Sequence, residues 1–120
     1  MNRDKLGGLD QFTGGDQQFI HPISGIRYTE GIRLLAEHGD CYWLIDAIAS
    51  YQPQLMRMPA LRQFQCWDLK VHPDKSCVLS CREDTDIEPV VRQEIQYTDF
   101  PLAQISLWVE QGVLLLPSEH

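Results

Sequence analysis

The sequence is poor in positive charge and lacks long apolar runs. Its 120 residues include 10 Lys and Arg against 17 Asp and Glu, a formal net charge of −7 at pH 7. Binding to nucleic-acid phosphates or to anionic membranes needs clustered Lys and Arg, which this balance argues against. No stretch approaches the roughly 18 consecutive apolar residues of a membrane-spanning helix. We therefore expect no direct nucleic-acid partner and no membrane partner.

The first residues, MNRDKLGG, also lack the apolar segment of a secretory signal. We therefore expect a complete, cytoplasmic chain in which the four cysteines are reduced thiols. A length of 120 residues with 43% hydrophobic residues suits a single domain covering residues 1–120.

Common catalytic and phosphate-binding motifs are absent. The sequence contains no G-x-S-x-G, H-E-x-x-H, G-K-[ST] or G-x-G-x-x-G. His21 and His72 each precede a proline and His38 ends a predicted helix, which are positions typical of exposed histidines. The sequence thus favours a protein without catalytic residues and without a cofactor.

Two predicted helices come before the main group of predicted strands. Thr29 is a suitable N-cap for the first helix and Gly39 a suitable stop. Asp40 is the expected cap of a second helix that runs to about Tyr51. The core-facing residues of this second helix recur at the helical period: Cys41, Leu44, Ile45, Ile48 and Tyr51.

From residue 63 onward the pattern changes to strands. Residues 63–71 and 76–83 flank a turn and predict a β-hairpin, and residues 17–21 suit a short strand. Further strands are predicted at 90–97, 105–109 and 113–116. We therefore expect an α+β fold, with two consecutive helices packed on one face of an antiparallel sheet of about four to five strands.

Three cysteines and a histidine in this hairpin have the residue types of a zinc site: Cys66, His72, Cys77 and Cys81. On one strand, however, Cys77 and Cys81 lie roughly 13 Å apart, too far to share an ion with bonds of about 2.3 Å. We therefore expect no metal. In the simplest hairpin register Cys66 lies opposite Cys81, which leaves either an oxidisable thiol pair or two small residues on a packed face. A one-residue bulge in the turn would abolish the pairing.

Two candidate binding surfaces stand out. Trp43, Asp46 and Ser50 share the face of the second helix opposite its core positions, and tryptophan is favoured at interface hot spots. The alternative is that Trp43 packs under the N-terminal segment while Asp46 accepts local hydrogen bonds. Tyr97 and Asp99 form the second candidate, although turn and helix-cap chemistry also explains them.

Four stretches in a fixed order give the chain a recognisable pattern. They are FTG (12–14), YTEG with LAE (28–31 and 35–37), YWLIDAIAS (42–50), and YTDFP with LLLPSE (97–101 and 114–119). In this pattern the sequence resembles a family of small uncharacterised bacterial proteins, found in cyanobacteria and in plasmid or phage contexts. The resemblance implies a stand-alone cytoplasmic protein, and it implies no activity, ligand or catalytic residue. The cysteines at 66, 77 and 81 are not part of the pattern.

These observations leave the function unknown, with three hypotheses. The leading one is a non-catalytic interaction or accessory domain that binds another protein or itself as a homodimer. The first alternative is a small-molecule-binding protein or enzyme with a pocket between helices and sheet, to which Tyr28, Asp46 and Asp99 contribute. A cleft of buried groups with shifted pKa values would favour it, and dispersal over the surface would contradict it. The second alternative is an acidic decoy that mimics nucleic acid for a mobile element, although the acidic residues are scattered.

Overall fold

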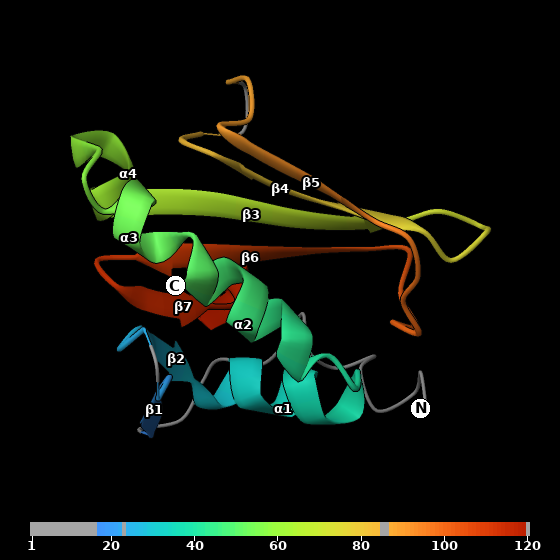
Figure 1. Ribbon diagram of the computed structural model, residues 1–120. Helices are drawn as coiled ribbons and strands as arrows, with labels where there is room; N and C mark the ends of the chain where they lie inside the picture. Colours follow the sequence, from blue (N-terminus) through green and yellow to red (C-terminus); the bar gives the residue numbers. More distant parts are fainter. Residues whose placement is uncertain (1–16, 23, 85–86, 120) are drawn as a thin grey trace.

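A seven-stranded sheet dominates the computed structural model, which describes residues 17–22, 24–84 and 87–119. The strands are β1 (Gln18–Ile20), β2 (Arg27–Thr29), β3 (Phe64–Val71), β4 (Cys77–Arg82), β5 (Val91–Ile95), β6 (Gln104–Glu110) and β7 (Val113–Leu115). Across the sheet they follow the order β1-β2-β7-β6-β3-β4-β5. Among the described residues, β1 and β5 are therefore the two end strands (Figure 1).

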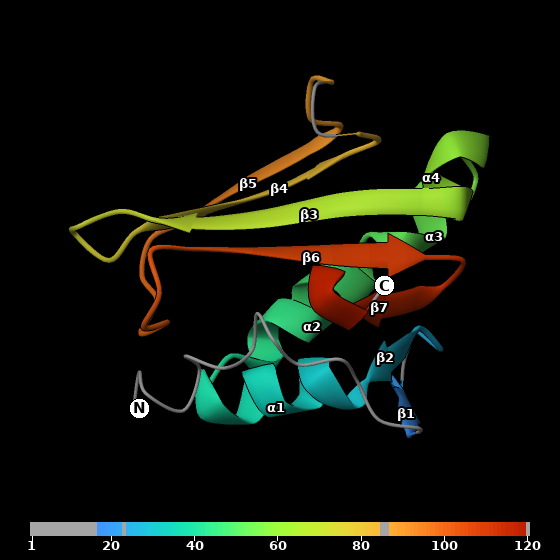
Figure 2. The same ribbon diagram turned by 180° about the vertical axis from the view of Figure 1, so that it is seen from behind.

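The helices lie between the second and third strands of the chain. They are α1 (Glu30–His38), α2 (Tyr42–Ser50), α3 (Gln52–Leu55) and α4 (Pro59–Gln63), and a 3-10 turn, η3 (Pro117–Glu119), follows the last strand. Figures 1 and 2 show α2 and α3 on one face of the sheet, with α1 below them beside β2 and β7. The mixed α+β content is thus confirmed, including the two consecutive helices.

The sheet differs from the expectation in size and in strand direction. It has seven strands within the described part of the chain rather than four to five, and β2 pairs with β7 in parallel. Strand β1 lies within the short strand predicted at residues 17–21, whereas β2 contains only three residues, too few to show a period-2 pattern in the sequence. Parallel strands need a long crossover connection, and all the elements from α1 to β6 supply one here.

Helix α1 begins and ends where the sequence predicts. The Thr29 hydroxyl accepts a hydrogen bond from the Ile32 N–H at 3.3 Å, and Gly39 is the C-cap. The same hydroxyl donates to Oε1 of Glu119 at 2.7 Å, and that oxygen also accepts from the Leu116 N–H at 2.9 Å. The Glu119 carboxylate therefore ties the end of the chain to the positive end of the α1 dipole.

The predicted cap of the second helix is wrong. Cys41, not Asp40, is the N-cap of α2, and no side chain caps it by a hydrogen bond. Asp40 instead has a left-handed backbone, with φ 50°, where the chain reverses between α1 and α2. The predicted core positions are confirmed for Cys41, Leu44, Ile45 and Ile48, each at most 4% exposed, while Tyr51 is half-buried.

The core between sheet and helices contains a buried polar network. Gln52 of α3 and Gln65 of β3 exchange two side-chain hydrogen bonds, at 2.9 and 2.8 Å. The indole N–H of Trp67 donates to Oε1 of Gln65 at 2.8 Å. Both glutamines are buried, at 5% and 0% exposure, so their amides pair with protein groups instead of water.

Candidate functional site

The three candidate residues on the outer face of α2, Trp43, Asp46 and Ser50, make separate contacts. Trp43 is half-buried and packs against the core. The Ser50 hydroxyl donates to the carbonyl of Ala47 within the same helix, at 2.6 Å. Asp46 contacts the β1–β2 connection, through a 2.8 Å hydrogen bond between its Oδ1 and Nε2 of His21.

His21 is a buried residue that joins the β1–β2 connection to α2. It is 8% exposed rather than exposed as the sequence suggests. Its Nδ1 accepts the N–H of Ser24 at 3.2 Å, which requires the proton of the neutral ring to be on Nε2, the atom facing Asp46. The Ser24 hydroxyl also lies 3.1 Å from Nδ1 and accepts the Ile26 N–H at 3.2 Å.

The set of Ser24, His21 and Asp46 has the residue types of a hydrolase triad, but its bonds serve the turn. Nδ1 and the hydroxyl both accept backbone N–H groups that close the connection between β1 and β2. The Asp46 side chain is 70% exposed, whereas the orienting carboxylate of a triad is buried. We interpret this set as a clamp that fixes the β1–β2 connection to α2.

The other candidate residues lie apart. Tyr28 is half-buried in β2 and stacks on Phe19, with ring centroids 5.5 Å apart. Tyr97 is 63% exposed and donates to the carboxylate of Asp99, which raises the pKa of the Tyr97 phenol. Each pair makes its own local contacts, and nothing in these contacts joins Tyr28, Asp46 and Asp99 in one site.

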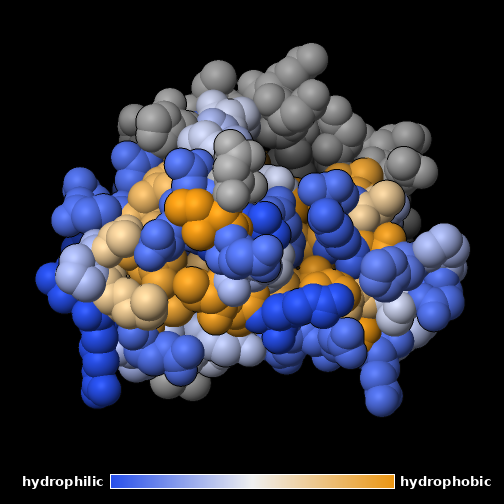
Figure 3. All heavy atoms as spheres, turned by 90° about the horizontal axis from the view of Figure 1, so that it is seen from above, coloured by the Kyte–Doolittle hydropathy of each residue, from blue (hydrophilic) through white to orange (hydrophobic). Residues whose placement is uncertain are grey.

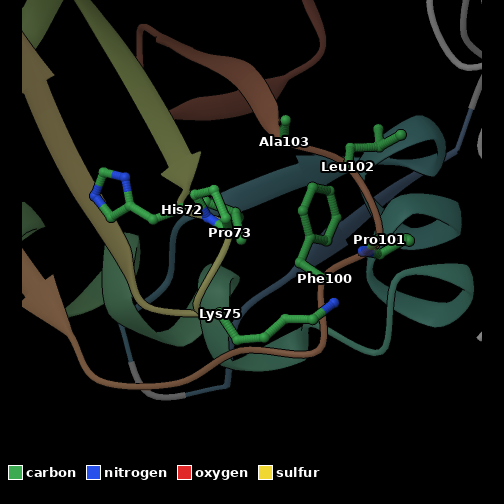
Figure 4. A pocket seen from close by; sticks show the side chains of 8 residues that line it. His72, Pro73, Lys75, Phe100, Pro101, Leu102 and Ala103 are labelled. Atoms are coloured by element: carbon green, nitrogen blue, oxygen red, sulfur yellow. The ribbon is translucent and has the colours of Figure 1, made fainter.

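A hollow lies beside Asp99 at the end of β3. Its volume is about 250 Å³, and its lining is Val71, His72, Pro73, Lys75, Phe100, Pro101, Leu102 and Ala103. Figure 4 shows the Phe100 ring standing in the centre of this group, with the His72 ring turned away from it. The hollow is formed by the β3–β4 turn and the segment before β6, so it is not the expected pocket between helices and sheet.

The hairpin register places Cys66 and Cys81 on opposite faces of the sheet, so the predicted pairing is wrong. Cys66 lies opposite Arg82, and Cys81 lies opposite Trp67. The cause is the turn: Val71 pairs with Cys77, one position further than expected, and Lys75 takes φ 74°. A one-residue slip moves every side chain of a strand to the other face, so the two thiols cannot form a cross-strand disulfide.

All four cysteines are free and buried. Burial raises the pKa of the Cys41 thiol and of the Cys81 thiol from 9.0 to about 12, and nearby Asp40 and Cys66 add to the two shifts respectively. Burial also raises the pKa of Cys66 and of Cys77. These groups are therefore protonated thiols with low nucleophilicity at neutral pH.

Two results follow for the thiols. We expect a maleimide or disulfide reagent to label all four slowly in the native state at pH 7.5 and fully after unfolding in urea. Cys41 and Cys81 lose their thiol protons near pH 9 in the unfolded chain and near pH 12 in the folded chain, so stability should be full below pH 9 and fall as the pH rises above it. Urea midpoints at pH 7.5, 9 and 10.5 measure the fall, which should be shallower in Cys81→Ala. Equal labelling rates with and without urea would contradict the burial of the thiols.

The edge of the sheet at β5 begins with a β-bulge. The Val90 N–H donates to the carbonyl of Cys81 at 2.8 Å, although the strand register pairs Cys81 with Val91. Two residues of β5 therefore face one residue of β4. This hydrogen bond also shows that the Cys81 carbonyl points toward β5.

That direction fixes which backbone groups of β5 face the open side. The N–H and C=O of one strand residue point to the same neighbour, and the direction alternates along the strand. Cys81 and every second residue before it on β4 pair with Val91, Gln93 and Ile95. These three residues of β5 therefore direct their backbone groups toward β4. Arg92 and Glu94 direct theirs away, and no strand in the described ranges pairs with that side. We call these outward groups the β5 edge.

Exposed side chains and a hollow accompany the β5 edge. Ile87 and Val90 are 44% and 41% exposed just before the strand. A hollow of about 440 Å³ lies at the other end, with Arg92, Glu94 and Ile95 in its lining. Figure 3 views the molecule from the side on which β5 is the last strand, and hydrophobic residues there lie among hydrophilic ones.

A family model matches residues 4–120, nearly the whole chain, and describes a family of unknown function, DUF6876. The chain belongs to this family. The unknown function inferred from the sequence agrees with that description. No curated protein and no solved structure matches the chain.

The family description assigns this DUF6876 member no activity and no site. None of its described helices is long and apolar enough to cross a membrane. Within residues 17–22, 24–84 and 87–119, no group of three or more His, Cys, Asp or Glu is placed to hold a metal ion.

Neither the β5 edge nor the contact of His21 with Asp46 was predicted from the sequence. The signal for the edge was present, because Pro89 stands just before a strand and proline is confined to strand starts, bulges and edge strands. No comparable signal marks His21, since its partner Asp46 is 25 positions away in the sequence.

Proposed function

We propose that this protein is a non-catalytic protein-interaction domain and that the β5 edge is where its partner binds. The observation that carries the proposal is the outward direction of the Arg92 and Glu94 backbone groups at the end of the sheet. An added strand satisfies such groups by main-chain hydrogen bonds, a common mode of protein and peptide recognition.

The side chains around the β5 edge make it selective. Arg92 and Glu94 are 57% and 78% exposed in their side chains, and charges on an edge strand discourage indiscriminate pairing. A partner strand must therefore bring complementary charge as well as backbone groups. Val90 adds exposed apolar surface at the start of the strand.

We further propose a bacterial, cytoplasmic protein. The resemblance to a family of small bacterial proteins supports a bacterial source. Four free, buried thiols suit a reducing compartment.

Proline at position 92 tests the proposed function. Arg92→Pro removes an outward N–H without removing a hydrogen bond to β4, and an edge position tolerates proline. We expect affinity capture with the tagged wild-type protein, from extract of its native cell, to recover a stoichiometric protein partner. Arg92→Pro should recover at least tenfold less of it.

Arg92→Ala is the matched control, because it removes the same side chain and keeps the N–H. It should retain more of the partner than Arg92→Pro, with both variants showing wild-type circular dichroism and melting temperature. Equal capture by Arg92→Pro would contradict the proposal, as would a stoichiometric metabolite recovered without any protein.

A further inference from the structure

The five residues of β5 are complementary to themselves when read in the opposite direction. The strand is Val91-Arg92-Gln93-Glu94-Ile95. Laid antiparallel against a second copy with Gln93 opposite Gln93, it sets Val91 opposite Ile95 and Arg92 opposite Glu94. Apolar residues then meet apolar residues, and a cation meets an anion on both sides of the centre.

The backbone of β5 fits the same arrangement. In an antiparallel pair, opposed residues alternate between those that exchange hydrogen bonds and those that do not. With Gln93 at the centre, the hydrogen-bonded pairs are Arg92 with Glu94 of the other copy. These are the two residues whose N–H and C=O groups point outward, so the pairing satisfies all of them in both copies.

The faces of the two sheets also agree. Opposed residues lie on the same face, so Val91 and Ile95 stay on the side that carries the helices, where Val91 is 6% exposed and Ile95 half-buried. Gln93 is half-buried on that side and accepts the Tyr51 hydroxyl at 2.8 Å through Oε1. Its amide N–H groups are donors suited to the facing Gln93.

Charge excludes the neighbouring registers. Centring the pair on Arg92 sets arginine against arginine, and centring it on Glu94 sets glutamate against glutamate, and like charges directly opposed are destabilising. A slip by one residue sets the helix-bearing face of one sheet beside the bare face of the other. Within one chain, a guanidinium nitrogen of Arg92 lies 3.5 Å from Oε1 of Glu94, and both side chains are exposed. Such an exposed ion pair contributes little free energy, so the two side chains can pair with a second copy instead.

We infer that the occupant of the β5 edge is a second copy of this chain, paired antiparallel about a twofold axis at Gln93. The two sheets become one continuous sheet across an isologous interface. This inference rests on the proposed function, since it names the partner of the same edge.

Charge reversal tests the pairing. In wild type, sedimentation equilibrium should detect a dimer. Arg92→Glu sets like charges opposite each other twice per dimer, and so does Glu94→Arg, so each should raise the dimer dissociation constant by at least about tenfold. The double variant R92E/E94R restores opposite charges and should return the constant to within about threefold of wild type.

Lys70→Glu is the control for net charge. Lys70 is exposed on β3, two strands from the edge, and the substitution changes the net charge as Arg92→Glu does. The dissociation constant should stay within about threefold of wild type, because nothing in the proposed interface changes.

The outcomes separate the two proposals. A wild-type chain that stays monomeric at all concentrations overturns self-pairing, and so does a double variant that fails to recover or a dimer insensitive to positions 92 and 94. In each case the capture experiment with Arg92→Pro still decides whether the edge binds another protein. If Arg92→Pro changes neither captured partner nor dimer, the edge itself is not the interaction site.

Discussion

We expect Gln65→Leu to lower the free energy of unfolding by about 3 kcal/mol. Gln65 is fully buried and joins three elements, because it bonds to Gln52 of α3, to the carbonyl of Leu61 in α4 and to Trp67 of its own strand. Leucine fills a similar volume but removes the partner of Oε1 of Gln52 and of the Trp67 indole N–H, both of which stay buried. Unsatisfied buried groups cost about 1–3 kcal/mol each.

Urea unfolding followed by tryptophan fluorescence measures this loss. Gln104→Leu is the matched control, since it is the same substitution at an exposed strand position and should change the free energy by less than about 0.5 kcal/mol. A loss below about 1 kcal/mol in Gln65→Leu would show that the network contributes little net stability.

Gly39→Ala should cost about 2 kcal/mol, the range of overpacking in a close-packed interior. A Cβ at this position would lie 2.8 Å from the carbonyl oxygen of Leu35 and 2.9 Å from the ring of Phe100. The backbone of Gly39 has an ordinary right-handed helical conformation, with φ −89°, so the cost comes from contact and not from backbone strain. Phe100 is 2% exposed and cannot turn into solvent.

A double-mutant cycle with Phe100→Leu tests the cause. If the ring is the obstacle, Gly39→Ala should cost less in the Phe100→Leu background than in wild type, by about 0.5–1 kcal/mol. Thermal or urea unfolding of the four proteins gives the coupling. Strictly additive losses would assign the clash to the Leu35 carbonyl and to the Cys41 sulfur, which lies 3.0 Å from the added Cβ.

Local signals predicted several elements correctly. Thr29 caps α1, Gly39 ends it, and the apolar period of residues 41–48 marks the buried side of α2. The hairpin of β3 and β4 is also found, with its turn at residues 72–76. Each signal depends on residues within a few positions of one another, which a single sequence displays directly.

The order of the strands was not predictable from the sequence, because packing decides which strands become neighbours in the sheet. Strand β6 returns beside β3 rather than beside β5, and β7 then places itself between β6 and β2. The sequence shows that these strands are apolar, but it carries no local mark of which partner each one pairs with.

The candidate site shows the same division. The sequence marked Asp46 as part of a binding surface or as an acceptor of local hydrogen bonds. Its observed partner, His21, lies 25 positions away in the sequence. The Cys66 and Cys81 pair failed because one left-handed residue, Lys75, lengthens the turn and shifts the register. The β5 edge depends on strand order, since a strand is an edge only when no other strand lies beside it.

The sequence alone determined that this protein has little positive charge and no long apolar run. It also predicted two helices, one from its capping residues and one from its apolar period, and a set of short strands. These follow from composition and from contacts between near neighbours. The tertiary structure alone decided that β5 lies at the end of the sheet, that Arg92 and Glu94 direct their backbone groups outward, and that the thiols lie apart. The physical reason is that strand order and register are set by contacts between distant residues, whose free energies become comparable only when the chain is folded.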